Sequence, residues 1–208
     1  MKLAIFGGTG KTGQHLIQQA LDKGHEVVAL VRTPSKVTTH HPQLKIIQGD
    51  IVDADCIAGV VQGVDAVISV LGPTNNKLEY TISRGMENIL MAMKKQNVHR
   101  IVISAGAGVR EPQDRPNLID RFFGLLLNVL SKNVVADMKQ VVHKVQTSDR
   151  DWTVVRVPML TDQPAQGTLV VGNVGDIRSR ISRADMAAFM LKQLNDNRYL
   201  KLSPAISN

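Results

Sequence analysis

The sequence of 208 residues is poor in cysteine and in aromatic side chains, and it has no long apolar run. Its single cysteine, Cys56, excludes an internal disulfide and favours a cytoplasmic location. Aromatic residues make up 3% of the chain and the basic residues form no run, so we expect no nucleic-acid partner despite a formal charge of +7. The longest apolar stretch, residues 122–130, is too short to cross a membrane, and we expect no membrane association.

Short apolar runs alternate with helix-like segments along the chain. Strands are expected at 2–6, 26–31, 44–48, 65–71, 100–104 and 152–157, with an edge strand at 199–203. Helices are expected at 11–23, 53–63, 78–96 and 182–196, and over much of 109–147. Apolar strands that alternate with helices predict a parallel sheet covered on both faces. We therefore predict an α/β fold in a single domain over 1–208, with a doubly wound Rossmann-type sheet.

The stretch GGTGKTG at residues 7–13 contains both the GKT of a P-loop and glycines spaced as in a dinucleotide-binding turn. A P-loop needs a glycine five residues before Gly10, and that position is Ile5, inside the first expected strand. The dinucleotide pattern Gly8-x-Gly10-x-x-Gly13 fits, and so does its variant that starts at Gly7. Because the turn follows a strand and opens a helix, the first helical N–H groups would face a diphosphate.

The end of the second expected strand indicates which nicotinamide cofactor is preferred. NAD-binding proteins usually place Asp or Glu there to hold the ribose hydroxyls, whereas this chain has Arg32, with Thr33, Ser35 and Lys36 close by. A guanidinium binds a 2′-phosphate that a carboxylate would repel. The sequence therefore predicts NADP(H) as the cofactor, and it predicts no metal site.

The chain resembles the atypical short-chain dehydrogenases/reductases, in the NAD(P)H-binding group that includes biliverdin-IXβ reductase, also called flavin reductase. The resemblance rests on IFGGTGKTG, GHEVVALVR, GDIVDAD, GVDAVISVLG, VHKV, DQPAQG and ISRADMAAFML, which run across nearly the whole chain.

The resemblance adds cofactor contacts just after later strands to those predicted at the glycine turn and around Arg32. Together, the residues on the adenosine and phosphate side would be Gly7, Thr9, Gly10, Lys11, Thr12, Gly13, Arg32, Thr33, Lys36, Asp50, Ile51, Leu71 and Gly72. Residues on the nicotinamide side would be Ser104, Ala105, Gly106, Pro158, Met159 and Leu160.

The chain departs from carbonyl-reducing members of the superfamily because it lacks a Tyr-x-x-x-Lys acid. Tyr80 is followed four residues later by Arg84, and Tyr199 by Ser203. Reduction of a flavin tolerates this, because hydride passes between stacked rings and the proton can come from water.

The residues expected beside the nicotinamide also differ from those of the resembling reductase. Gly106 and Met159 stand where the resembling reductase has a serine and a histidine, so biliverdin is disfavoured as the acceptor. Ser104 is the candidate catalytic hydroxyl, and it could equally hydrogen-bond the cofactor or a loop. His143 is a titratable candidate, although a histidine on a helix is more often a packing or surface residue.

We expect an NADPH-dependent reductase of a planar small molecule, a flavin or quinone rather than a tetrapyrrole, acting as a monomer or homodimer. An NADP(H)-binding redox sensor without turnover is the alternative, and a sugar-nucleotide epimerase is disfavoured by the missing Tyr-Lys pair. The apolar region 109–140 could be a lid over the substrate, a subunit interface or part of the core.

Overall fold

The computed structural model describes residues 1–72, 80–116 and 131–208. The strands are β1 (Lys2–Phe6), β2 (Glu26–Val31), β3 (Leu44–Gln48), β4 (Ala66–Ser69), β5 (Arg100–Gly106), β6 (Asp151–Val157), β7 (Met159–Thr161), β8 (Val170–Gly172), β9 (Arg180–Ser182) and β10 (Ala205–Ser207). The helices are α1 (Lys11–Asp22), α2 (Ala54–Val61), α3 (Thr81–Lys95), α5 (Lys132–Gln146) and α6 (Arg183–Lys192), with 3-10 turns η1 (Pro34–Lys36) and η2 (Asn197–Tyr199).

The main sheet has the order β3-β2-β1-β4-β5-β6-β10-β8. Every neighbouring pair is parallel except β10 and β8, which run antiparallel at the edge. The chain winds outward in one direction through β1, β2 and β3 and then in the other from β4, so the strand order reverses between β1 and β4. This arrangement confirms the predicted doubly wound α/β fold, and it directs attention to the carboxyl ends of β1 and β4 as the ligand crevice.

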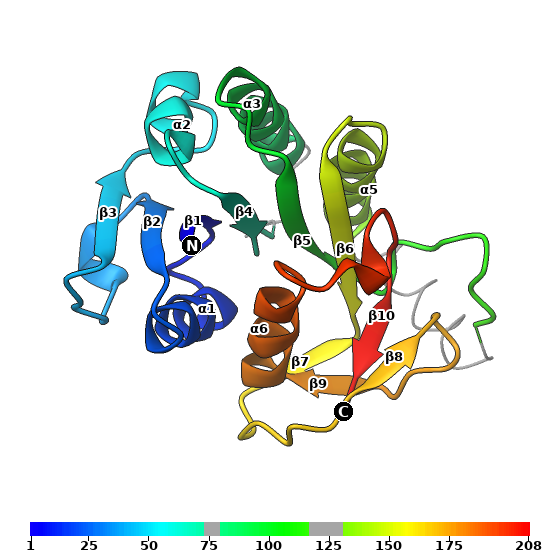
Figure 1. Cartoon of the computed structure of the whole chain (residues 1–208). Helices are drawn as coiled ribbons and strands as arrows, with labels where there is room; N and C mark the ends of the chain where they lie inside the picture. The colour runs from blue at the N-terminus through cyan, green and yellow to red at the C-terminus, as the bar shows by residue number, and fades with distance from the viewer. Residues whose placement is uncertain (73–79, 117–130) are drawn as a thin grey trace.

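Helices cover both faces of this sheet (Figure 1). One apolar core lies between the sheet and α2, α3 and α5, and the other lies between the sheet and α1 and α6. The central strand β1 contributes to both, since Ala4 and Phe6 face one core while Leu3 and Ile5 face the other. A strand that is buried on both faces has no solvent-facing positions, which explains why its sequence is a continuous apolar run.

Several helix ends follow from the local sequence. α1 stops before Gly24, which has φ +75° and lets the N–H groups of Gly24 and His25 bond back to Leu21 and Ala20. α6 begins at Ser182, whose hydroxyl accepts the N–H of Asp185 at 3.0 Å. Both ends agree with the predicted boundaries.

The carboxyl-terminal region differs from the prediction. Residues 199–203 form no edge strand: Tyr199 ends η2, and Leu202 makes only an isolated bridge to Thr153. The strand beside β6 is instead β10, three residues long, and a second sheet pairs β7 with β9. Strands of three residues depend on pairing with partners far along the chain, so their local sequence does not predict them.

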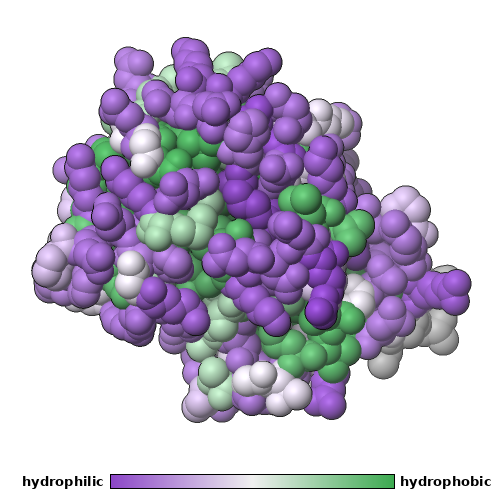
Figure 2. Space-filling model, in the orientation of Figure 1, coloured by the Kyte–Doolittle hydropathy of each residue, from purple (hydrophilic) through white to green (hydrophobic). Residues whose placement is uncertain are grey.

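The region 109–140, expected to be largely helical, is described only in part. Residues 109–116 form no helix and contain a turn at 112–113, α5 begins at Lys132, and residues 117–130 lie outside the described residues. The face of the molecule shown in Figure 2 is mostly hydrophilic, with hydrophobic groups scattered over it. No helix within the described ranges is both long and apolar enough to cross a bilayer.

Candidate functional site

The glycine turn between β1 and α1 has the close packing that its spacing predicts. Gly7 has φ +89°, a conformation that favours glycine, and its carbonyl accepts the N–H of Gly10 at 3.1 Å. A Cβ on Gly13 would overlap the Gly7 carbonyl oxygen and lie 2.7 Å from the Gly8 Cα. Gly7 and Gly13 are therefore required by the turn itself.

Gly10 is different, because the protein's own packing does not demand a glycine there. Its φ of −73° suits any residue, and a Cβ would meet only the Gly7 oxygen, at 3.4 Å. Gly10 caps α1 without a side-chain acceptor, the first turn of α1 has no acidic residue, and no other described side chain takes that place. The start of α1 therefore offers free N–H groups and positive dipole potential to an anion that approaches the backbone closely.

A cavity of about 270 Å³ opens at the point where the strand order reverses. It brings together eight of the predicted residues from four separate strand ends, namely Gly7, Thr9, Gly10, Arg32, Asp50, Ile51, Leu71 and Gly72. Its other lining residues are Leu30, Val31, Gly49, Val70, Tyr80, Thr81, Ile82 and Asp137. These residues would surround the adenosine and diphosphate part of a dinucleotide.

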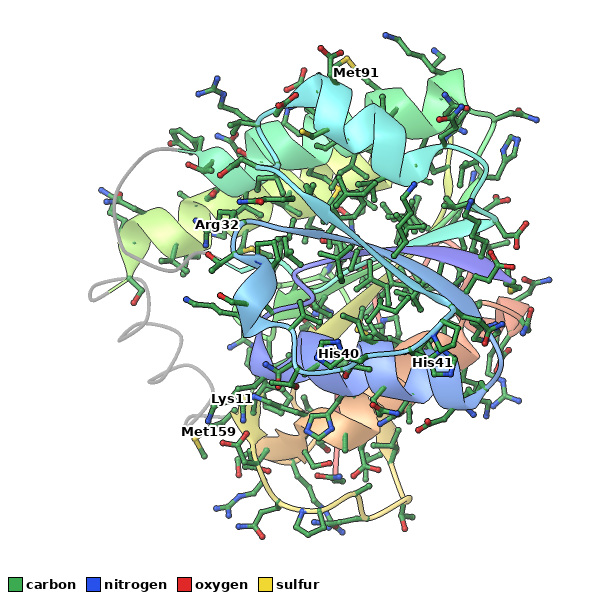
Figure 3. All side chains as sticks on the ribbon, turned by 90° about the vertical axis from the view of Figure 1, so that its left-hand side faces the viewer. Lys11, Arg32, His40, His41, Met91 and Met159 are labelled. Carbon is green, nitrogen blue, oxygen red and sulfur yellow. The ribbon has the colours of Figure 1, made fainter. Side chains whose placement is uncertain are left out.

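Arg32 follows β2 directly and is exposed at the edge of the cavity. Figure 3 places Arg32 on the same side of the molecule as Lys11 and Met159, which belong to the starts of α1 and β7. Within the described ranges Arg32 forms no ion pair, so its guanidinium is available to a ligand. Thr33 and Lys36 are exposed just beyond it, Lys36 as the last residue of η1, and neither lines the cavity.

The cavity wall formed by Asp50 and Ile51, just after β3, is held by hydrogen bonds and by the close packing of α3. The Asp50 carboxylate accepts the N–H of Val52 at 3.2 Å, which closes a tight turn. The Ile51 carbonyl accepts from the Asn88 amide at 3.2 Å, and a Cβ on Gly85 would come within 2.7 Å of the Ile51 side chain. Gly85 thus lets α3 approach Ile51, a contact that no sequence motif indicated.

The predicted nicotinamide-side residues lie outside this cavity. Ser104 to Gly106 end β5, paired with β6, and Ser104 is half-buried. Pro158 follows β6, and Met159, the first residue of β7, is 61% exposed. Their predicted roles stay predictions, as does that of Ser104 as a catalytic hydroxyl.

Lys11 forms an ion pair instead of lining the cavity. Its ammonium lies 2.6 Å from Asp162, just after β7, and the other oxygen of Asp162 lies 2.6 Å from Arg183 at the start of α6. The hydrogen bond from Lys11 lowers the pKa of Asp162, so this carboxylate stays charged. The Asp162 carboxylate thereby connects the start of α1, beside the glycine turn, to the strand that carries Met159.

Two other titratable candidates lie elsewhere. His143 is exposed near the end of α5 and does not line the cavity, which agrees with the surface alternative. Cys56 on α2 donates from its Sγ to the Asp53 carboxylate at 3.1 Å, and this bond raises the pKa of the thiol. A thiol with a raised pKa is a poor nucleophile.

Comparison with known proteins decides the family. Residues 7–197 match the model of the NAD(P)H-binding family. The chain belongs to the NAD(P)H-binding family. Membership confirms the predicted resemblance and the prediction of an NAD(P)H-type cofactor, and the matched range contains the glycine turn and every cavity-lining residue.

Individual relatives cover the chain to different extents. The chain is 24% identical over 227 aligned residues to oxidoreductase aflX of Aspergillus parasiticus, covering 99% of this chain and 83% of that protein. It is 35% identical over 120 residues to a 3β-hydroxysteroid dehydrogenase/Δ5→4-isomerase of Mycobacterium tuberculosis, covering 52% of this chain. The chain spans about a third of that dehydrogenase, 32% of its length.

A solved structure of similar fold is ChuY, an anaerobilin reductase from Escherichia coli O157:H7. It superposes with a TM-score of 0.82 at 19% identity, covering 100% of this chain and 97% of ChuY. At this identity the likeness shows the fold.

Proposed function

We propose that this protein is an NADPH-dependent reductase that transfers hydride to a planar small molecule such as a flavin or quinone. The observation that carries the proposal is a cavity lined by both the glycine turn and Arg32. Arg32 stands directly after β2, where NAD-binding proteins usually have an Asp or Glu. The uncapped start of α1 suits the diphosphate, and the free guanidinium suits an extra phosphate on the adenosine ribose.

The cofactor, when bound, would supply the hydride, and the chain's own residues would bind and orient it. Gly10 would let the diphosphate reach the N–H groups of α1, Asp50 and Ile51 would border the adenine, and Arg32 would hold the 2′-phosphate. Met159 offers an apolar side chain without an exchangeable proton, and Gly106 offers none either. Such a surface suits stacking of a planar ring whose proton comes from water.

The variant Arg32→Ala tests the cofactor preference. We expect the Kd for NADPH, measured by the quenching or enhancement of nicotinamide fluorescence, to rise by roughly 10- to 100-fold. The reason is that hydrogen bonds to a charged group contribute about 1.5–3 kcal/mol. The Kd for NADH should change little. Lys45→Ala, an exposed lysine on β3 outside the cavity, is the matched control. Equal losses for NADPH and NADH would refute the assignment of Arg32.

An NADP(H)-binding sensor without turnover is the second candidate, favoured by the lack of a proton donor at Gly106 and Met159. Absorbance at the nicotinamide band, followed with NADPH and FMN, riboflavin, dichlorophenolindophenol or a quinone, separates the two. Turnover with any acceptor supports the reductase. Tight binding of NADPH without turnover on all of them supports the sensor.

A further inference from the structure

Two helices begin at the wall of the same cavity, and only one of them has its first N–H groups bonded to a side chain. α1 starts beside Gly10 without any side-chain cap. α3 starts at Thr81, and its first turn is occupied by the carboxylate of Asp137, which comes from α5. Asp137 accepts the N–H of Ile82 at 3.2 Å and that of Ser83 at 3.0 Å.

The local sequence of α3 cannot supply this cap. Its N-cap residue is Tyr80, which has no acceptor close to its backbone and lies in the left-handed region at φ 48°. The Ser83 hydroxyl bonds back to the Tyr80 carbonyl at 3.1 Å. A carboxylate 54 positions beyond Ser83 therefore performs the role that Ser, Thr, Asp or Asn usually performs at the N-cap.

Asp137 is also part of the cavity surface. Only 6% of it is exposed, and it lines the cavity together with Tyr80, Thr81 and Ile82. Its charge offsets the positive end of the α3 dipole, which would otherwise attract anions as the start of α1 does. The start of α1 therefore attracts a phosphate, whereas at the start of α3 the Asp137 carboxylate already occupies the N–H groups and repels one.

We infer that Asp137 is a specificity-determining residue: it excludes phosphate from the start of α3 and so fixes the direction in which the cofactor lies. The inference rests on the proposed function, because it concerns the same cofactor. A repulsive group against the wrong orientation is a general way to obtain specificity without adding contacts to the right one.

The test uses inorganic pyrophosphate as the probe. Isothermal titration of the wild-type protein should give one pyrophosphate site per chain, in competition with NADPH. In Asp137→Asn the side-chain oxygen can still accept one N–H while the charge is gone, so a second pyrophosphate site should appear. Pyrophosphate should then compete with NADPH about two- to fivefold more strongly than in the wild type, because anion attraction at a helix start contributes about 0.3–1 kcal/mol.

The variant Asp53→Asn is the matched control. Asp53 also accepts two N–H groups at a helix start, from Asp55 at 3.0 Å and Cys56 at 3.1 Å on α2, but it does not line the cavity. Its competition between pyrophosphate and NADPH should match the wild type, because an anion attracted to the start of α2 would bind outside the cavity. Asp137→Glu, which keeps the charge, should stay at one site.

Two results would overturn the inference. One is a second pyrophosphate site in the wild type that persists in Arg32→Ala, so that the guanidinium of Arg32 does not account for it. The other is that Asp137→Asn still binds one pyrophosphate per chain. This result overturns the inference even if the affinities for NADPH and pyrophosphate both increase by the same factor, because no new site has then opened. If the wild type binds no NADPH at all, it is the proposed function that fails, so the two failures are distinguishable.

Discussion

In the first half of the chain, residues 1–104, the described interior contains no buried charged side chain, whereas the interior of the second half, residues 105–208, contains several. In the first half the buried polar side chains among the described residues are those of Thr12, Ser69 and Ser83. Beyond residue 130 the described residues include four buried charged side chains, Asp137, Arg150, Arg156 and Asp185. The first half carries the glycine turn, and the second carries Met159 and its neighbours on the predicted nicotinamide side.

This difference shows that the two halves are held in different ways. Glycines bring backbone against backbone in the first half, so an added atom should damage it. Buried carboxylates in the second half bind backbone N–H groups of distant loops; Asp185, for example, accepts from Gln166 at 2.7 Å and Gly167 at 3.0 Å. Removing one such charge should damage that half most, because the N–H groups that it accepts lose their partner.

The largest effect is expected for Arg156→Ala. The Arg156 guanidinium donates to Asp114 at 2.5 Å and to the Ser203 carbonyl at 2.7 Å, and the side chains of the pair are 0% and 2% exposed. Breaking a buried pair costs about 3–5 kcal/mol, which denaturant unfolding would measure. Arg178→Ala, at an exposed arginine, should be nearly neutral. A loss below about 1 kcal/mol would contradict the contrast between the halves.

The same pair predicts an acid dependence. Burial by itself would raise the pKa of Asp114, but the hydrogen bonds from Arg156 and from the N–H groups of Glu111 and Val174 outweigh it and lower the pKa. A folded-state pKa below the unfolded one stabilises the protein above the unfolded pKa, and this contribution is lost as the pH falls. Melting temperatures should therefore fall on acidification below about pH 4, and less steeply in Asp114→Asn.

Much of the first half was predictable because its signals are local. Gly7, Gly13 and Gly24 stand where a turn or a helix end needs them, and the apolar runs give β1, β2 and β3 within the predicted bounds. Asp137 was not predictable, since it caps a helix by accepting the N–H of Ile82, which lies 55 positions before it in the chain. The pairing of β7 with β9 likewise depends on a loop anchored by a buried Asp185 rather than on any periodicity.

The next largest effect is expected for Gly13→Ala. The new Cβ would overlap the Gly7 carbonyl oxygen, so the turn must open and α1 must move away from β1. Overpacking of this kind costs about 1–3 kcal/mol, and NADPH binding should fall with it. Gly59→Ala on α2 is the control, because a Cβ there meets nothing within 4 Å. It should stabilise the protein by about 0.5–1 kcal/mol through helix propensity.

Gly10→Asp separates binding from stability within the first half. The backbone of Gly10, at φ −73° and ψ 159°, already has N-cap geometry, so the new carboxylate should cap α1 as Asp137 caps α3. Stability should rise by only about 0.3 kcal/mol, because glycine is itself a tolerated N-cap residue, while the Kd for NADPH should rise at least about tenfold through repulsion of the diphosphate. Gly10→Ala adds the Cβ without the charge. Full NADPH affinity in the aspartate variant would place the diphosphate elsewhere.

The smallest effect is expected where the halves meet, at Asp162. Its ion pair with Lys11 is largely open to water, with 70% of the Lys11 side chain and 56% of the Asp162 side chain exposed, while the Arg183 side chain of the second pair is 19% exposed. Asp162→Asn should therefore lower the stability by no more than about 1 kcal/mol. Loss of this negative charge leaves Lys11 free beside the start of α1. NADPH should therefore bind about two- to threefold more tightly at low salt, and the gain should vanish near 0.5 M salt because exposed charges are screened. A gain that survives high salt would mean that Asp162 acts through the position of β7 rather than through its charge.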